Sequence, residues 1–279
     1  MRTKATALAF LLGLLSTAAL AAPDVLHLLD TAPIKGHPEH LGGGTMVKFK
    51  LYLQDGSAKG FKCLFKPRQA GEQTFRHEIA AYRIDRLCHM GRVPVVARRV
   101  FPHSTFAGLS GAGRMLVSGG KIEGSLQQWV QNASDPYGLG AESWSRAWLR
   151  RLSTFSVEIA DHDAVRQISD MFLLDYLQGN MDRFSGGNIL RDSRGDFWFI
   201  DNAEAFGGST RPLHDFDRVR RFDRKAVEAL RRATEADFTR EVGPYLTASE
   251  LRGLLARRLH ALAHVQSVVN TYGEARAYP

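Results

Sequence analysis

The chain has 279 residues, of which 44% are hydrophobic and only two are cysteines. That length suffices for one large or two-lobed domain with its own core, and two cysteines are too few for a scaffold built on disulfides. The formal net charge of +8 favours acidic or phosphorylated partners. Nucleic acid is not the expected partner, because the sequence has no aromatic-basic stacking pattern and no zinc-finger spacing.

Residues 1–21 have the composition of a cleavable secretory signal peptide. Arg2 and Lys4 precede an apolar run that ends in small residues, with Ala19 and Ala21 in an A-x-A-like pattern. The run is shorter than the roughly 20 residues that a membrane-spanning helix needs. We therefore expect cleavage near Ala21 and a secreted or periplasmic protein without a stable membrane span.

The next part of the chain predicts a β-rich N-terminal half. After an N-terminal extension, residues 22–40, alternating hydrophobic residues from Val47 to Leu53 predict a half-buried strand. "QDGS" predicts a turn, and "FKCLFKP" predicts the returning strand, which ends at Pro67. "TFRHEIAAYRIDRLCHMG" predicts a helix that Gly91 caps. "RVPVVARRVF" and "GRMLVSGG" predict two further short strands.

From "GSLQQWVQ" onward the sequence predicts a mainly helical half. A helix over about 162–178 precedes "NILR" and "DFWFI", which "DSRG" joins into a β-hairpin. "RKAVEALRRATE" and "ASELRGLLARRLHALAHVQSVVNTYG" predict two amphipathic helices. The expected fold is α+β and two-lobed, with residues 41–118 as the N-lobe and 119–279 as hinge and helical C-lobe. A cleft between the lobes would hold the site.

The two cysteines, Cys63 and Cys88, allow two arrangements. They form either one disulfide or two buried free thiols, and the sequence does not decide between them.

The hairpin brings three polar side chains together. Asp182 precedes it, Asn188 opens its first strand and Asp201 follows its second strand. We expect these side chains to converge, because a hairpin folds its two ends together. Phosphoryl transfer needs such a set: one carboxylate to accept the proton of the attacking hydroxyl, and a second carboxylate and an amide oxygen to hold metal ions on the nucleotide phosphates.

The N-terminal half supplies the groups that bind phosphate in such a reaction. Lys66 ends the second strand, and Glu78 lies on the following helix, from which it can pair with Lys66. Three glycines, 42–44, would let backbone N–H groups approach phosphates closely. Each feature alone has an ordinary structural explanation as a turn, an edge lysine or a solvated helix residue. Their order along the chain is that of a kinase.

Longer stretches make a resemblance specific: "LGGGTMVKFKLYLQDG", "HEIAAYRIDRLCHMGRVPVVARRV", "KIEGSLQQWV" and "DYLQGNMDRF" leading to "FIDNAEAFG". Over about residues 41–206 the chain resembles the secretory-pathway kinases related to four-jointed and to the Golgi casein kinase. That resemblance implies an atypical protein-kinase fold and entry into the secretory pathway. It also implies use of ATP with Mn²⁺ or Mg²⁺ to phosphorylate Ser/Thr of a protein or, in one branch, a xylose of a glycan.

The resemblance also implies roles for individual residues. Lys66 would contact the nucleotide phosphates and pair with Glu78, and Asp182 would be the catalytic base. Asp201 and Asn188 would be the metal ligands.

The same resemblance assigns residues around the nucleotide. It places Gly119 to Ser125 near the segment that joins the lobes, close to the adenine, whereas Gly43 and Gly44 are expected near the phosphates because they belong to the glycine run. Arg183 is expected to be a structural partner of the loop rather than a catalyst.

The chain departs from the family pattern in three respects. Five residues separate Asp182 from Asn188, one more than in D-x-x-x-x-N, and the pair Gly186-Gly187 can absorb the extra residue. The animal members are rich in disulfides, whereas two cysteines point to a compact bacterial relative. A bacterial periplasm holds little ATP, which leaves the phosphoryl donor open.

Several functions therefore stay open at this stage. The first is an active protein or glycan kinase. The altered spacing before Asn188 favours a catalytically weak pseudokinase that binds a nucleotide or a partner. A lipid (phosphoinositide-like) kinase and an exported α+β domain with chance kinase-like spacing are the remaining alternatives, and the sequence does not name the acceptor.

Overall fold

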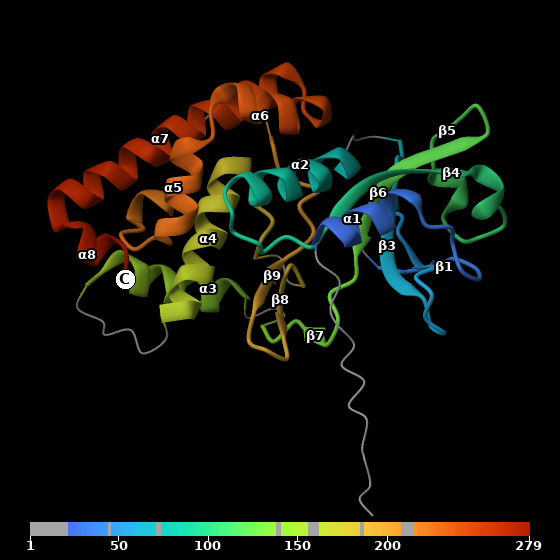
Figure 1. Cartoon of the computed structure of the whole chain (residues 1–279), viewed down its shortest axis with the longest axis horizontal. Helices are drawn as coiled ribbons and strands as arrows, with labels where there is room; N and C mark the ends of the chain where they lie inside the picture. Colours follow the sequence, from blue (N-terminus) through green and yellow to red (C-terminus); the bar gives the residue numbers. More distant parts are fainter. Residues whose placement is uncertain are drawn as a thin grey trace, which may run out of the picture.

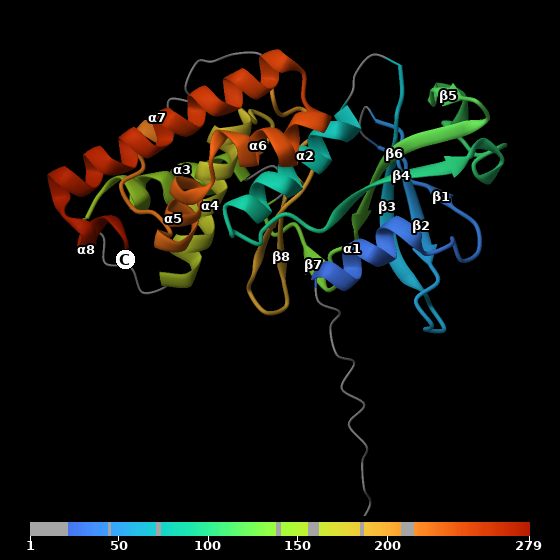
Figure 2. The same ribbon diagram turned by 45° about the horizontal axis from the view of Figure 1, so that its top comes forward.

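The computed structural model describes residues 22–43, 46–70, 74–137, 141–155, 162–184, 187–207 and 215–279. They form an α+β fold of two lobes, as predicted, with an antiparallel sheet at one end and a group of helices at the other (Figure 1). Helix α2 lies between them in both ribbon views (Figures 1 and 2). The residues of the expected signal peptide, 1–21, lie outside the described residues.

The N-terminal sheet contains the two strands that the hydrophobic alternation predicts. Its strand order is β1-β2-β3-β6-β4, with β5 paired to β6. Phe49, Leu51 and Leu53 of β2 are fully buried while the residues between them are half-buried, which confirms the predicted pattern. The bounds are β1 Glu39–His40, β2 Phe49–Leu53, β3 Phe61–Pro67, β4 Val96–Pro102, β5 Val117–Ser118 and β6 Lys121–Gln128.

The segment 22–40 is part of the sheet lobe and not a peripheral extension. Helix α1, Ala22–Thr31, packs on β4 and β6, and β1 pairs with β2. The guanidinium of Arg99 on β4 donates to the carbonyl oxygens of Leu29 and Ala32, both at 2.6 Å. These bonds satisfy carbonyls that the end of the helix leaves open.

"GSLQQWVQ", residues 124–131, was expected to begin the helical half, and that expectation is wrong for residues 124–128, which belong to the strand 121–128. That strand is β6, which lies between β3 and β4. A Cβ at Gly124 would lie 2.6 Å from the Phe65 ring and against the carbonyl oxygen of Lys66, so the close approach of the two strands requires glycine. Gly124 makes the segment look less like a strand in the sequence, because glycine is uncommon in strands. In the structure the same glycine allows β6 to pair with β3.

Helix α2, Thr74–Leu87, contacts both the sheet and the helices α4 and α6. It does not end at Gly91 as predicted: His89 takes the left-handed conformation first, with φ +55°, and its N–H bonds the carbonyl of Arg86. Cys63 on β3 and Cys88 after α2 are buried free thiols, so they form no disulfide.

The C-terminal lobe is built around α4, His162–Gln178, which is buried along almost its whole length. The predicted hairpin is present as β8, Ile189–Asp192, and β9, Phe197–Phe199, with β7, Ala133–Ser134, beside β8. The sequence predicted α5 and α7 but missed α3 and α6. The remaining bounds are α3 Ala141–Ser153, α5 Arg224–Arg232, α6 Glu235–Val242, α7 Ala248–Tyr272 and α8 Glu274–Ala277, with short 3₁₀ turns η1 His103–Thr105, η2 Ala112–Arg114, η4 Phe216–Arg218 and η5 Gly243–Tyr245.

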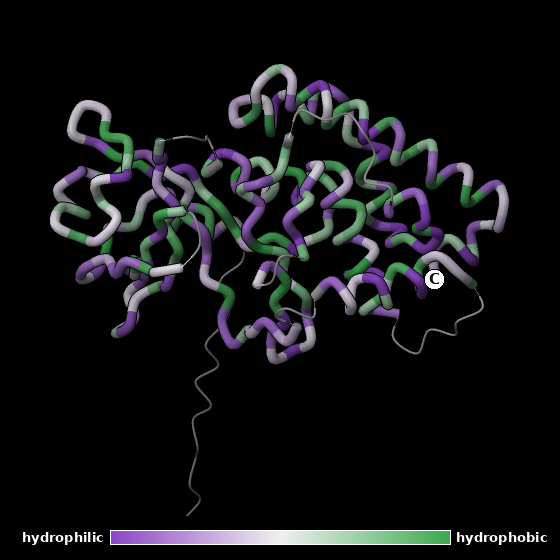
Figure 3. Tube along the Cα trace, turned by 180° about the vertical axis from the view of Figure 1, so that it is seen from behind, coloured by the Kyte–Doolittle hydropathy of each residue, from purple (hydrophilic) through white to green (hydrophobic). Residues whose placement is uncertain are grey.

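Hydrophobic segments concentrate toward the middle of the molecule (Figure 3). Among the described residues, no helix is both long and apolar enough to span a membrane.

Candidate active site

A cavity of about 740 Å³ lies between the sheet and the hairpin region. Lys66, Lys48 and Gln127 line it from the sheet side. Asp182, Asn188 and Asp201 line it from the other side, so the three side chains around the hairpin converge as predicted.

Lys66 sits at the end of β3 and holds two carboxylates. Its Nζ donates to Oε1 of Glu78 and, at 2.9 Å, to Oδ1 of Asp201. The amine is buried, and burial disfavours its charged form. The two carboxylates outweigh this penalty and raise the pKa of Lys66 above its usual value. Lys66 therefore carries its positive charge throughout the physiological pH range.

Glu78 joins Lys66 to the chain that follows β9. It is almost fully buried on α2, and its second oxygen, Oε2, accepts the backbone N–H of Asn202 at 3.2 Å. One carboxylate therefore fixes both the cation and the backbone next to Asp201. The predicted pair of strand lysine and helix glutamate is present.

Asp201 reaches the cavity through an unusual backbone conformation. Its φ is +55°, a left-handed value that non-glycine residues seldom adopt. Burial alone would raise the pKa of this carboxyl, but the ammonium of Lys66 outweighs that effect and holds the pKa below its usual value. Asp201 is thus ionised and can act as an anionic ligand.

Asp182 and Asn188 lie side by side despite the extra residue between them. Asn188 Nδ2 donates to the carbonyl oxygen of Asp182 at 2.8 Å and to its Oδ2 at 3.3 Å. Gly187 takes φ +77°, and its N–H donates to Oδ2 of Asp135 at 3.0 Å. A glycine in the left-handed region therefore helps to take up the insertion, as predicted; Gly186 lies outside the described residues.

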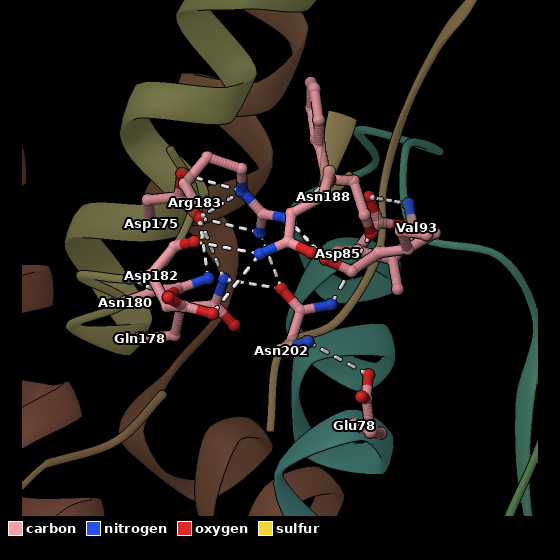
Figure 4. Close-up of polar contacts among 12 residues, drawn as sticks. Glu78, Asp85, Val93, Asp175, Gln178, Asn180, Asp182, Arg183, Asn188 and Asn202 are labelled. Atoms are coloured by element: carbon pink, nitrogen blue, oxygen red, sulfur yellow. Dashed lines mark hydrogen bonds and ion pairs between the residues drawn. The ribbon is translucent and has the colours of Figure 1, made fainter. Parts of the chain in front are cut away.

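Arg183 lies at the centre of the hydrogen bonds that hold the loop around Asp182 (Figure 4). Its buried guanidinium pairs with Asp175 at 2.9 Å and donates to the carbonyl oxygens of Asn188 at 3.0 Å and Ile200 at 2.6 Å. It also donates to Oδ1 of Asn202 at 2.7 Å. These contacts join α4 to both ends of the hairpin, and they are the contacts of a structural residue.

Of the glycines expected near the nucleotide, Gly43 and Gly119 are not among the residues that line the cavity. Gly43 lies between β1 and β2 with φ +83°, and Gly44 lies outside the described residues. Gly119 is in the turn between β5 and β6 and is not among the residues that line the cavity. The assignment of Gly119 to the nucleotide site is therefore corrected, because residues 121–128 form a strand and Gln127 near its end lines the cavity instead.

Sequence reasoning also missed Lys48 and Met181. The Lys48 ammonium lies close enough to Asp201 to help lower the pKa of that carboxyl. Met181 precedes Asp182, is 82% exposed and lines the cavity. Lys48 belongs to the alternating sequence that predicted the strand, although β2 itself begins at Phe49, and Met181 lies in a loop. Neither residue carries a sequence signal of its own.

The oxygen donors around the cavity fit a hard divalent cation. Asp201 offers a carboxylate, and Asn188 offers the amide oxygen that its bonds to Asp182 do not use. The described residues contain no cluster of three or more His, Cys, Asp or Glu side chains that could hold a metal ion. Mg²⁺ and Mn²⁺ accept such a sparse protein site when substrate phosphates and water supply the other ligands.

No protein-family model and no curated protein sequence matches the chain. Solved structures do match. Hydra Fam20 with sugar has a TM-score of 0.69 at 16% identity over 92% of each chain. The Golgi casein kinase has a TM-score of 0.61 at 18% identity over 92% of this chain and 79% of that chain. Its form with Mn/ADP bound has a TM-score of 0.64 at 18% identity, over 92% and 78%. The chain therefore has the fold of these atypical kinases.

Proposed function

We propose that the chain is an exported kinase that transfers the γ-phosphoryl group of ATP to a hydroxyl acceptor with a divalent metal ion. The observation that carries this proposal is the convergence on one cavity of Lys66, held by Glu78, with Asp182, Asn188 and Asp201. These are the groups that phosphoryl transfer requires. The fold shared with the Golgi casein kinase supports it.

Positive charge for the nucleotide phosphates comes from the sheet. Lys66 is permanently charged in its pair of carboxylates, and Lys48 adds a second cation to the same wall of the cavity. The two cations attract a polyphosphate, and Lys66, which its carboxylates hold in place, orients it without further reorganisation of its own side chain.

Asp182 is the proposed base. During transfer, the acceptor oxygen bonds to the γ-phosphorus, the bond from that phosphorus to the bridging oxygen of the β-phosphate breaks, and ADP leaves. Asp182 accepts the hydroxyl proton, while Asn188 orients its carboxylate through the 3.3 Å contact. A metal ion held by Asp201 and Asn188 would neutralise charge on the phosphate oxygens.

For the acceptor, we propose Ser/Thr of a protein or a sugar hydroxyl of a glycan. The proposal draws on two structures of the same fold, one titled as the Golgi casein kinase and one as hydra Fam20 with sugar. Export to a secreted or periplasmic location rests on residues 1–21, whose sequence is typical of a cleaved signal peptide.

An acceptor panel tests the proposal. The mature chain from Ala22 is incubated with γ-labelled ATP and Mn²⁺ or Mg²⁺, and casein, a xylosylated glycan primer and phosphoinositides are offered separately. We expect label in casein or the glycan, none with EDTA, and none with Asp201→Ala. Label in phosphoinositides alone would indicate a lipid kinase instead. Turnover that Asp201→Ala leaves unchanged would refute the metal site.

A catalytically weak binding module is the second candidate, and the extra residue between Asp182 and Asn188 is the feature that favours it. Thermal stabilisation by ATP with Mn²⁺, without transfer to any acceptor, would support this function over the first.

A further inference from the structure

His77 joins three elements next to the site. It lies on the first turns of α2, immediately before Glu78. Its Nδ1 is 2.9 Å from the carbonyl oxygen of Ala203, and its Nε2 is 2.9 Å from Oε1 of Glu250 on α7. The ring of Phe206 packs on it, with 5.2 Å between ring centroids. The side chain of His77 is only 13% exposed, so water does not readily replace these partners.

Both partners of His77 are hydrogen-bond acceptors. A carbonyl oxygen only accepts. The other oxygen of Glu250, Oε2, accepts the N–H of Thr247 at 2.6 Å in the capping box of α7. Burial would raise the pKa of Glu250, but its bonds to Thr247 and the neighbouring His77 hold the pKa below the usual value, so the group is an ionised acceptor. His77 can therefore donate a hydrogen bond to both acceptors only when each of its ring nitrogens carries a proton.

The contact to Ala203 lies close to the groups that hold Lys66. Ala203 is two residues after Asp201, and the intervening Asn202 donates its N–H to Glu78. Two successive residues of α2, His77 and Glu78, are therefore hydrogen-bonded to the backbone of the two residues that follow Asp201. Glu250 secures the same histidine to the C-terminal lobe.

We propose that His77 is a positioning residue of this site, whose imidazolium locks the chain after Asp201 between α2 and α7. The inference rests on the proposed function, because the lock keeps Asp201 where it meets Lys66 and a metal ion. A neutral ring has a single N–H, so one of the two acceptors would then face a lone pair.

Glu250→Gln is the matched variant. The carboxamide oxygen also accepts from a ring N–H, so this variant keeps the hydrogen bond to His77. Glutamine also serves at this position of a capping box, so the start of α7 is kept. His77→Phe fills similar space but forms neither hydrogen bond.

The first readout is the split between kcat and KM for ATP with Mn²⁺ at one fixed pH. We expect His77→Phe to lower kcat about tenfold or more, the size of one lost hydrogen bond to a charged group, with KM for ATP little changed. Glu250→Gln, which keeps an acceptor for the ring, should retain most of the wild-type kcat. Full kcat in His77→Phe, or an equal loss in Glu250→Gln, would overturn the proposal.

The second readout needs no activity, so it separates this inference from the proposed function. Amide hydrogen exchange is compared between wild type and His77→Phe at one pD near 6, without nucleotide. The amides of Asn202, Ala205 and Phe206 are hydrogen-bonded and should exchange at least about tenfold faster in the variant. Those of β2 should not change. Unaltered exchange at 202–206 would refute the lock even if the wild type transfers phosphate, whereas faster exchange without any transfer would refute only the kinase.

Discussion

Asp170 on α4 is a buried acid that no hydrogen bond fully satisfies. Its side chain is 3% exposed, and its Oδ1 has no hydrogen-bond partner among the described residues. Burial, followed by the nearby charge of Asp223, raises the pKa of Asp170 well above its usual value. The folded protein therefore keeps this proton at pH values where the unfolded chain releases it.

The sign of the effect on stability follows from that difference. As pH rises through about 4, the unfolded chain loses the proton while the folded protein retains it, so stability falls until the folded group also ionises. Asp170→Asn removes this penalty. We expect it to raise Tm by about 2–4 °C at pH 7, the effect of about 1 kcal/mol in a domain of this size, and to give little gain near pH 4. Thermal unfolding at the two pH values measures it.

Asp175, one turn further along α4, is the matched control. Its carboxylate is paired with the buried Arg183, so Asp175→Asn should lower Tm at pH 7 because it leaves a buried guanidinium without its counter-charge. A gain for Asp170→Asn that is equal at pH 4 and pH 7 would show that the proton is not its cause.

Residue order alone predicted the central contacts of the site. A lysine ending a strand and a glutamate on the next helix are brought together by local geometry, and a hairpin brings Asp182 near Asp201. His77, Lys48 and Gln127 could not be found in this way. Lys48 and His77 lie next to groups that are far away in sequence, and Gln127 is placed by the pairing of β6 with β3 and β4. The sequence around a lysine or a histidine does not indicate which carboxylate or carbonyl it will contact.

Among the elements, β6 controls the position of Lys66. Its residues 124–128 pair with 63–67 of β3, and Gly124 leaves room only for a hydrogen atom beside Phe65 and the Lys66 carbonyl. The same glycine misled the sequence prediction, because glycine is depleted in strands when no close contact is known. The hairpin and α4 were predictable because their hydrophobic periodicity is uninterrupted.

Gly124→Ala should therefore disturb both stability and the site. The added methyl group must push β6 away from β3, which we expect to cost about 1–3 kcal/mol and to weaken binding of Mn²⁺-ADP through Lys66. Gly113, where a Cβ would meet nothing within 4 Å, provides the control substitution, and Gly113→Ala should be near neutral. Chemical denaturation and calorimetric titration measure the two effects; wild-type stability in Gly124→Ala would contradict the packing argument.

At the scale of the whole molecule, the two lobes meet through α2 and through Lys66. The sequence predicted this architecture from the order of strands, helix, buried helix and hairpin, and the solved kinase structures share the fold. The role of residues 22–40 in the sheet lobe was not predictable, because their mixed polarity does not reveal that Val25 and Leu29 are buried.

The most direct test of the central claim is phosphoryl transfer by the wild type beside Asp182→Asn, with calorimetric binding of Mn²⁺-ADP measured on both. Asparagine keeps the shape of the side chain but cannot take the hydroxyl proton. The account predicts transfer by the wild type, a loss of about 10²-fold or more in the variant, the usual range for a general base, and similar nucleotide binding in both. Equal transfer by the two proteins would contradict the account.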